Sequence, residues 1–226
     1  DISLLKSTKN KKWFELLSSD NKIDCKLVDS IKKDSIRKPW APFTTSTLQQ
    51  EWARKFGFWV KQTMMVAQKL YEWMDLWNWE RQGLITYMRT DSVNLSDLAK
   101  GDAKKMIESN FWKEYSKSRD FKTKSAWAQE AHEAIRPTDI TRSPESLASV
   151  LDAQQLKLYT LIWKRTVASQ MSDAVVEVTT FTFSPDRAKN QEWITKWEVI
   201  KFDWFMKLYI EWTDDESDDD DNENST

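Results

Sequence analysis

Hydrophobic positions recur with helical spacing through the middle of the chain and with alternate spacing on either side of it. Between about residues 40 and 171, apolar side chains fall three and four residues apart. Residues 176–183 and 194–201 alternate apolar and polar side chains, and a weaker alternation runs through residues 23–31. The pattern predicts an α+β fold in which a helical domain lies between two β segments.

Capping residues give the limits of the helices within this pattern. The predicted helices run from Ser46 or Thr47 to Gly57, over 60–73, from Ser96 to 110, from Ser143 and Pro144, and from Asp152 to 171. Residues 111–141 are predicted to be mostly loop, with one helical turn near 129–134. A strand is expected at 83–89, and another at 205–210.

The charge distribution separates a basic body from an acidic tail. The formal charge of the chain is −2, but residues 214–226 hold eight acidic side chains and no basic one. Residues 1–213 therefore carry a net charge of +6, which permits a phosphate-binding surface. The tail is expected to be disordered. Four parts follow: a β and loop segment at 1–39, the helical domain at 40–171, a β segment at 172–213 and the tail.

The single cysteine and the hydropathy of the chain restrict its location. Cys25 has no second cysteine with which to form an internal disulfide, which is typical of a reducing compartment. No apolar run is long enough to span a membrane or to serve as a signal peptide. We therefore expect a soluble, cytoplasmic protein.

A tyrosine and an arginine stand two residues apart at the end of a short apolar run, in Gly83-Leu-Ile-Thr-Tyr87-Met-Arg89-Thr-Asp91-Ser. In an extended backbone Tyr87 and Arg89 would point the same way, so one phosphodiester could meet both. A free tyrosine has a pKa of about 10, so its attack on phosphorus needs an electropositive setting, which Arg89 could supply. The structural alternatives are a tyrosine on a half-buried strand and a solvated arginine.

Residues 83–92 closely resemble the active-site segment of type IA DNA topoisomerases, the bacterial topoisomerase I group. Residues 129–138, which contain the only histidine of the chain, His132, resemble the histidine-bearing active-site segment of the same family. Residues 42–51 and 161–171 resemble the two ends of its helical gate domain. The resemblance covers about residues 39–212 and implies that the flanking β segments form part of the arch that holds the gate.

The resemblance assigns roles to five side chains. Tyr87 would attack one DNA strand, bond to its 5′ phosphate and leave a 3′ hydroxyl that later reverses the reaction without ATP. Arg89 would bind the scissile phosphate, and His132 would donate a hydrogen bond to that phosphate or to Tyr87. Asp91 and Arg136 are further candidates for DNA binding, although Asp91 could equally cap a turn and Arg136 could hold its loop.

The same resemblance gives the expected partners and cofactor. The substrate would be a single-stranded segment of negatively supercoiled DNA, and the enzyme would be associated with the nucleoid. No metal is assigned to this chain. The Mg²⁺ of the full enzyme would be bound by a domain absent from it, so we expect an internal fragment, inactive alone, whose other partner is the remainder of the polypeptide.

Two other classes compete with this interpretation. Tyrosine recombinases and nickases also form phosphotyrosine, but recombinases carry their histidine and arginines before the tyrosine, whereas His132 and Arg136 follow Tyr87. A non-catalytic single-strand-binding module would use aromatic side chains to stack on bases. That alternative depends on the tryptophans.

The tryptophan and glycine counts are unusual in opposite directions. The chain has 14 tryptophans and 3 glycines, whereas average usage predicts about 16 glycines in this length. Most tryptophans, including Trp73, Trp77 and Trp79, stand where a turn calls for glycine, and only Trp163 lies inside an apolar helical stretch. We infer that thirteen of them are glycine in the host, which would read UGA as glycine where the printed sequence reads it as tryptophan. We call this the recoding hypothesis.

Overall fold

The computed structural model describes residues 25–72, 74–75, 81–121, 132–185 and 192–208. The chain divides into two compact units. The sheet unit comprises residues 1–36 and 175–202, and the helical unit comprises residues 37–174 and 203–226. The acidic tail and the first 24 residues, for which we predicted disorder and a β or loop segment, lie outside the described residues. The α+β class predicted from the sequence is confirmed.

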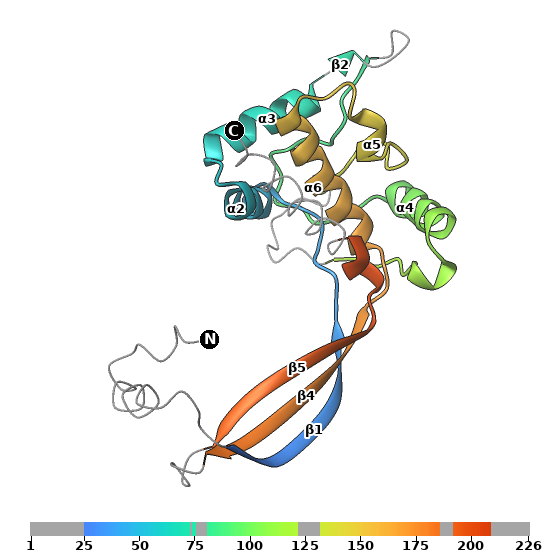
Figure 1. Cartoon of the computed structure of the whole chain (residues 1–226). Helices are drawn as coiled ribbons and strands as arrows, with labels where there is room; N and C mark the ends of the chain where they lie inside the picture. The colour runs from blue at the N-terminus through green and yellow to red at the C-terminus, as the bar shows by residue number, and fades with distance from the viewer. Residues whose placement is uncertain (1–24, 73, 76–80, 122–131, 186–191, 209–226) are drawn as a thin grey trace. The chain divides into compact units, whose positions relative to one another are not determined.

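The helical unit is built around one long helix. Its elements are α2 (Thr45–Phe56), α3 (Val60–Tyr71), a hairpin of β2 (Met74–Asp75) and β3 (Arg81–Gln82), α4 (Asp97–Asn110), η3 (Lys113–Tyr115), α5 (Pro144–Leu147), α6 (Ala153–Ser169) and η4 (Trp204–Met206). Helix α6 runs through the middle of this unit (Figure 1) and packs against α3, α5 and η4. Most of its residues from Leu158 onward are buried, so it forms the core against which the other helices are placed.

Two aromatic side chains of α6 fix the loop before α5. The indole Nε1 of Trp163 donates to the backbone oxygen of Ile140 at 2.8 Å, and the Tyr159 hydroxyl donates to that of Arg142 at 2.7 Å. Burial raises the pKa of the Tyr159 phenol, which keeps it protonated and able to donate. Both buried polar groups are thus satisfied, and the loop that leads away from the histidine-bearing segment is held to the core.

The capping predictions are mostly confirmed. Ser96 and Asp152 cap α4 and α6, Ser143 precedes Pro144 at the start of α5, and Gly57 ends α2 with a left-handed φ of 69°. The N-cap of α2, however, is Thr44 and not Ser46 or Thr47. The Thr44 and Thr47 side chains each bond the other's backbone N–H, so α2 begins earlier than predicted.

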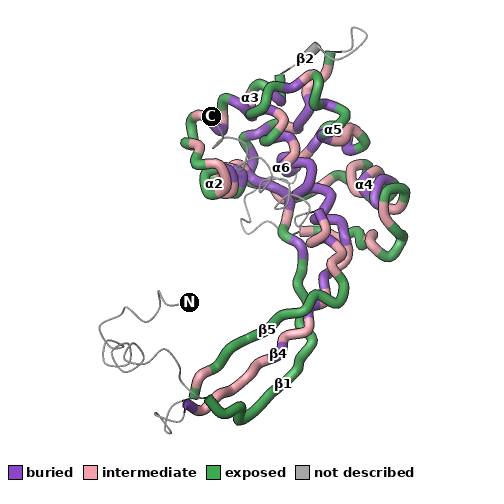
Figure 2. Tube along the Cα trace, in the orientation of Figure 1, coloured by how far each residue is buried: buried purple, intermediate pink, exposed green. Residues whose placement is uncertain are grey.

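The sheet unit contains three strands in the order β1–β4–β5. They are β1 (Cys25–Arg37), β4 (Ala174–Pro185) and β5 (Trp193–Phe202), and β4 pairs antiparallel with β5 in the register Val178↔Glu198. Strands β1 and β5 are exposed along nearly their whole length (Figure 2). On the central strand, Glu177 forms ion pairs with Lys32 and Lys201, both at 3.2 Å, which join the three strands.

Two of the predicted strands are wrong in detail. Residues 204–206 form η4 instead of opening a strand at 205, because Phe205 and Leu208 are buried in the core of the helical unit. The expected active-site strand is also absent: regular pairing stops at Gln82, and Ile85 makes a single bridge to Pro137. The predicted helical turn at 129–134 lies largely outside the described residues, and 132–134 are not helical.

Candidate active site

Exposure alternates along the segment that carries the tyrosine, although the segment is not a regular strand. Tyr87, Arg89 and Asp91 are exposed, whereas the residues between them are buried. Tyr87 retains 46% of its surface. Met88 and Thr90, which lie between them, are buried. The alternation is consistent with the expectation that Tyr87 and Arg89 point the same way.

Hydrogen bonds on Thr86 join the tyrosine segment to the histidine-bearing segment. The Thr86 N–H donates to the oxygen of Arg136 at 2.9 Å, and the Arg136 N–H donates to Thr86 Oγ1 at 3.0 Å. The Thr86 hydroxyl donates in turn to the oxygen of Ala134 at 2.7 Å. The two sequence motifs thus lie side by side, and Tyr87 follows directly after the residue that joins them.

Thr45, the first residue of α2, holds the chain on the other side of Tyr87. Its hydroxyl donates to the oxygen of Met88 at 2.8 Å and accepts from the N–H of Thr90 at 2.8 Å, while its own N–H donates to the oxygen of Thr90 at 2.9 Å. Sequence reasoning missed this residue. A side chain that bonds the backbone 43 residues away leaves no local pattern by which it could be found.

Gly83 allows the same segment to approach the end of α3. A Cβ at this position would lie 2.3 Å from the backbone oxygen of Tyr71, a separation that no side chain tolerates. The Leu84 N–H donates to Leu70 O at 2.7 Å, and Thr138 donates its hydroxyl to Gly83 O at 2.7 Å and its N–H to Leu84 O at 3.0 Å. Backbone on both sides of the candidate nucleophile is therefore fixed.

The close approach at Gly83 brings a second tyrosine to the site. The ring of Tyr71 meets the ring of Tyr87 edge to face, with centroids 5.4 Å apart and planes at 65°. The buried residues of α3 are Thr63, Val66, Ala67 and Leu70. Tyr71 lies at the end of the helix outside this buried face, and its ring is exposed.

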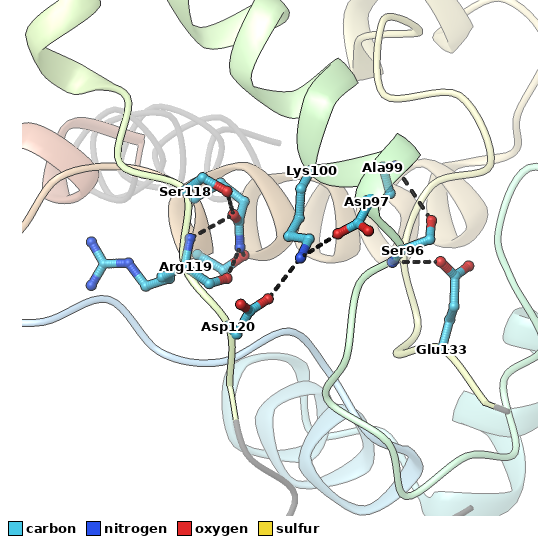
Figure 3. Close-up of polar contacts among 10 residues, drawn as sticks. Ser96, Asp97, Ala99, Lys100, Ser118, Arg119, Asp120 and Glu133 are labelled. Carbon is cyan, nitrogen blue, oxygen red and sulfur yellow. Dashed lines mark hydrogen bonds and ion pairs between the residues drawn. The ribbon is translucent and has the colours of Figure 1, made fainter. Parts of the chain in front are cut away.

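The loop that carries His132 is held by its neighbour Glu133. The Ser96 N–H donates to Glu133 Oε1 at 2.8 Å (Figure 3), and Arg136 Nη2 forms an ion pair with Oε2 at 2.6 Å. Partial burial opposes the charge of Glu133, but the hydrogen bonds from Ser96 and Arg136 outweigh it and lower the pKa. His132 itself is exposed. Arg136 also donates to Pro137 O at 2.8 Å, a geometry suited to holding the loop.

One basic side chain near this loop, that of Lys100, is paired with two acidic side chains. Lys100 of α4 lies between Asp97, at 2.8 Å, and Asp120, at 2.7 Å (Figure 3). Hydrogen bonds with Asp120 and Asp97 raise the pKa of Lys100 and keep it charged. Because two carboxylates surround it, Lys100 adds little positive potential for a phosphate. Arg89, in contrast, stands two residues after Tyr87 and is exposed.

The described residues contain neither a metal-binding cluster nor a membrane-spanning helix. No three His, Cys, Asp or Glu side chains among them are grouped so that they could hold a metal ion. No helix in that part of the chain is long and apolar enough to cross a membrane.

The chain matches a family model described as DNA topoisomerase over residues 3–225. It is 48% identical over 195 residues to the DNA topoisomerase 1 of Rickettsia felis and 47% identical over 193 residues to that of Rickettsia prowazekii. Each alignment covers 84% of this chain. The chain spans 25% and 24% of these two relatives, about a quarter of their length.

A solved structure with the same fold is the full-length topoisomerase I of Thermotoga maritima. The match has a TM-score of 0.73 at 37% sequence identity, and it covers 86% of this chain and 31% of that one. The architecture is therefore that of part of a larger enzyme.

Proposed function

The chain belongs to the DNA topoisomerase family, and on this premise we propose that Tyr87 is the strand-cleaving nucleophile of a type IA enzyme. One observation carries the assignment. Tyr87 is exposed in a segment whose backbone is bonded on one side to the histidine-bearing loop through Thr86 and on the other to α2 through Thr45. A nucleophile held in this way loses little entropy when it reaches the phosphate.

The proposed reaction is a transesterification. The phenolic oxygen of Tyr87 attacks the scissile phosphorus, a bond from that oxygen to phosphorus forms, and the bond from phosphorus to the 3′ oxygen breaks. The tyrosine loses its proton and the 3′ oxygen gains one. The products are a 5′-phosphotyrosine and a free 3′ hydroxyl. Because one phosphoester replaces another, the reverse reaction reseals the strand without ATP.

Four other residues take supporting roles in this proposal. Arg89 binds the non-bridging oxygens of the phosphate, where a planar guanidinium offers two parallel donors. His132 donates a hydrogen bond to the same phosphate or to Tyr87. Asp91, exposed two residues after Arg89, orients that side chain at the DNA. Arg136 supports DNA binding indirectly, by holding the loop of His132 through Glu133.

The whole enzyme would use this site to relax negatively supercoiled DNA, with residues 40–171 as the gate and the β segments as part of the arch. Mg²⁺ would assist from a domain outside this chain. Among the described residues, no three potential metal ligands are grouped to hold it. The partners are then DNA and the remaining domains of the polypeptide, and the setting is the nucleoid in the cytoplasm.

Adduct trapping tests the proposal. In a chimeric enzyme, this chain replaces the matching quarter of the Rickettsia felis DNA topoisomerase 1. The chimeric enzyme should form a covalent adduct with single-stranded DNA that retains a 3′ label and releases a 5′ label, and peptide mapping should find the phosphate on Tyr87.

The Tyr87→Phe variant should form no adduct but should bind single strands as before. The matched control is Tyr115→Phe, which alters a tyrosine of η3 and should leave adduct formation intact. Retention of the 5′ label would favour a recombinase-like polarity. Binding without any adduct would favour a non-catalytic single-strand-binding module.

A further inference from the structure

A pocket opens beside the tyrosine pair and has no part in the chemistry proposed above. Its volume is about 320 Å³. Among the described residues, its lining comes from the end of α3, from β3 and from the two bonded segments of the site: Tyr71, Glu72, Gln82, Gly83, Ile85 and Thr138.

We propose that this pocket holds one nucleobase of the cleaved strand, next to the scissile phosphate, and prefers a base with an exocyclic amino group. The inference rests on the proposed role of Tyr87. Tyr71 lines the pocket and also contacts the ring of Tyr87. A strand whose phosphate lies at the Tyr87 hydroxyl therefore passes the pocket with a neighbouring nucleotide.

The size and the wall of the pocket suit a single base. Its volume lies at the small end of the range of small-molecule sites, roughly 300–1,000 Å³, and is too small for several nucleotides. Tyr71 supplies an aromatic ring, on which bases of any sequence stack. Ile85 adds an apolar side chain to the lining.

The polar groups of the pocket select a base and disfavour a phosphate. The carboxylate of Glu72 repels phosphate but accepts a hydrogen bond from an amino group, as acidic side chains do from cytosine. Gln68 Nε2 donates to Glu72 Oε1 at 2.8 Å and orients the carboxylate. Thymine carries no exocyclic amino group and should be the poorest occupant. Gln82 offers both a donor and an acceptor to the base edge.

The floor of the pocket is preformed. Thr138 donates to the oxygen of Gly83 at 2.7 Å, so two lining residues are bonded to each other. Gly83 is in turn packed on the backbone of Tyr71, with no room for a side chain between them. A base would bind without first ordering these residues, and discrimination between bases would therefore appear in cleavage-site choice.

The test maps cleavage sites in the chimeric enzyme. Pools of single-stranded oligonucleotides, randomised around a central position, are cleaved in a single turnover, and the adducts are sequenced. The unmodified enzyme should disfavour thymine at one position flanking the cut. Glu72→Ala and Gln82→Ala should each weaken that preference about tenfold, the effect of one lost contact to a base edge.

Tyr71→Leu removes the stacking surface and should lower cleavage with every base at that position. Glu145→Ala, which removes an exposed carboxylate of α5 outside the pocket, should leave the profile unchanged.

The outcomes separate this inference from the proposed function. If adducts form at Tyr87 but the base profile is the same in the Glu72, Gln82 and unmodified enzymes, the pocket does not read a base and the inference is overturned. If the unmodified chimeric enzyme forms no adduct at Tyr87, the proposed function fails and the inference fails with it. Glu72→Gln, which keeps the size of the side chain, serves where the alanine variant unfolds.

Discussion

Thr86 and Arg136, fifty residues apart in the chain, exchange two hydrogen bonds within 3.0 Å. One partner directly precedes the candidate nucleophile and the other lies four residues after His132. The pair therefore sets the relation between the two parts of the candidate active site. Neither residue needs to touch DNA for its loss to impair cleavage.

Replacing Thr86 with valine should uncouple the two segments. The variant keeps the shape of the side chain but loses the bond to Ala134 O and the acceptor for the Arg136 N–H. The free energy of unfolding should fall by about 1–3 kcal/mol. The single-turnover cleavage rate of the chimeric enzyme should fall by a larger factor than its affinity for single-stranded DNA.

Thr86→Ser should retain most of the cleavage rate. The control is Thr160→Val, which removes a hydroxyl bonded within α6 and should cost stability without a specific loss of cleavage. Equal cleavage by the valine and parent enzymes would show that the coupling does not matter.

Gly83→Ala and Gly101→Ala should change stability in opposite directions. A Cβ at Gly83 meets the oxygen of Tyr71 at 2.3 Å, so the segment must shift, at a cost of about 1–3 kcal/mol. A Cβ at Gly101, inside α4, meets nothing within 4 Å, and alanine there should add about 1 kcal/mol. Urea unfolding of the two variants measures both. A neutral Gly83→Ala would mean that the approach to α3 is looser than described.

The helices could be predicted from the sequence but the geometry of the site could not, because the two depend on interactions of different range. Caps such as Ser96 and Asp152 bond groups within three residues, so their signal is local. The bonds of Thr45 and Thr86 cross 43 to 50 residues and depend on packing. The strand predicted at 205–210 is absent over its described residues, 205–208, in the same way, because the burial of Phe205 overrode the alternating pattern.

Arg89→Ala should lower single-turnover cleavage by about 100-fold or more, the effect of removing one donor to a developing charge. Arg89→Lys should recover part of the rate, since the charge remains but the planar fork is lost. The rate is measured with saturating single-stranded DNA. Arg54→Ala, at an exposed arginine of α2 paired with Glu51, is the control and should cleave normally. An unchanged rate in Arg89→Ala would place that side chain outside the site.

The bond network of Glu133 should make the histidine loop sensitive to acid. The pKa of Glu133 is lowered in the folded state. Its contribution to folding stability is therefore present above its unfolded pKa of about 4.3, and it is lost as the pH falls through the folded pKa. Glu133→Gln should therefore be less stable than the parent at pH 7, by about 1 kcal/mol, and nearly equal to it at pH 3. Denaturation at both pH values measures the difference, and a constant difference would contradict the assignment.

The recoding hypothesis can be tested at Trp204. Among the described residues, Trp204 is the one residue other than glycine whose φ is positive, at 36°. Trp204→Gly and Trp204→Ala both remove the ring that contacts Tyr115, but only glycine relieves the backbone, so the glycine variant should be more stable than the alanine variant by about 1 kcal/mol.

Trp163, in contrast, is buried and hydrogen-bonded, and glycine there should cost about 3–5 kcal/mol. Trp77 and Trp79, where we also expect glycine, lie outside the described residues. Peptide masses from the protein made in its own host decide the matter directly. Tryptophan at these positions would reject the hypothesis.

The order of strands in the sheet has a consequence for synthesis on the ribosome. Strand β1 precedes the helical unit and its neighbour β4 follows it, so β1 leaves the ribosome long before it has a partner. All thirteen of its residues are exposed even in the finished sheet, and until β4 arrives it is an open edge prone to pairing with other chains. The time for which β1 stays unpaired is therefore set by the synthesis of the helical unit that separates it from β4.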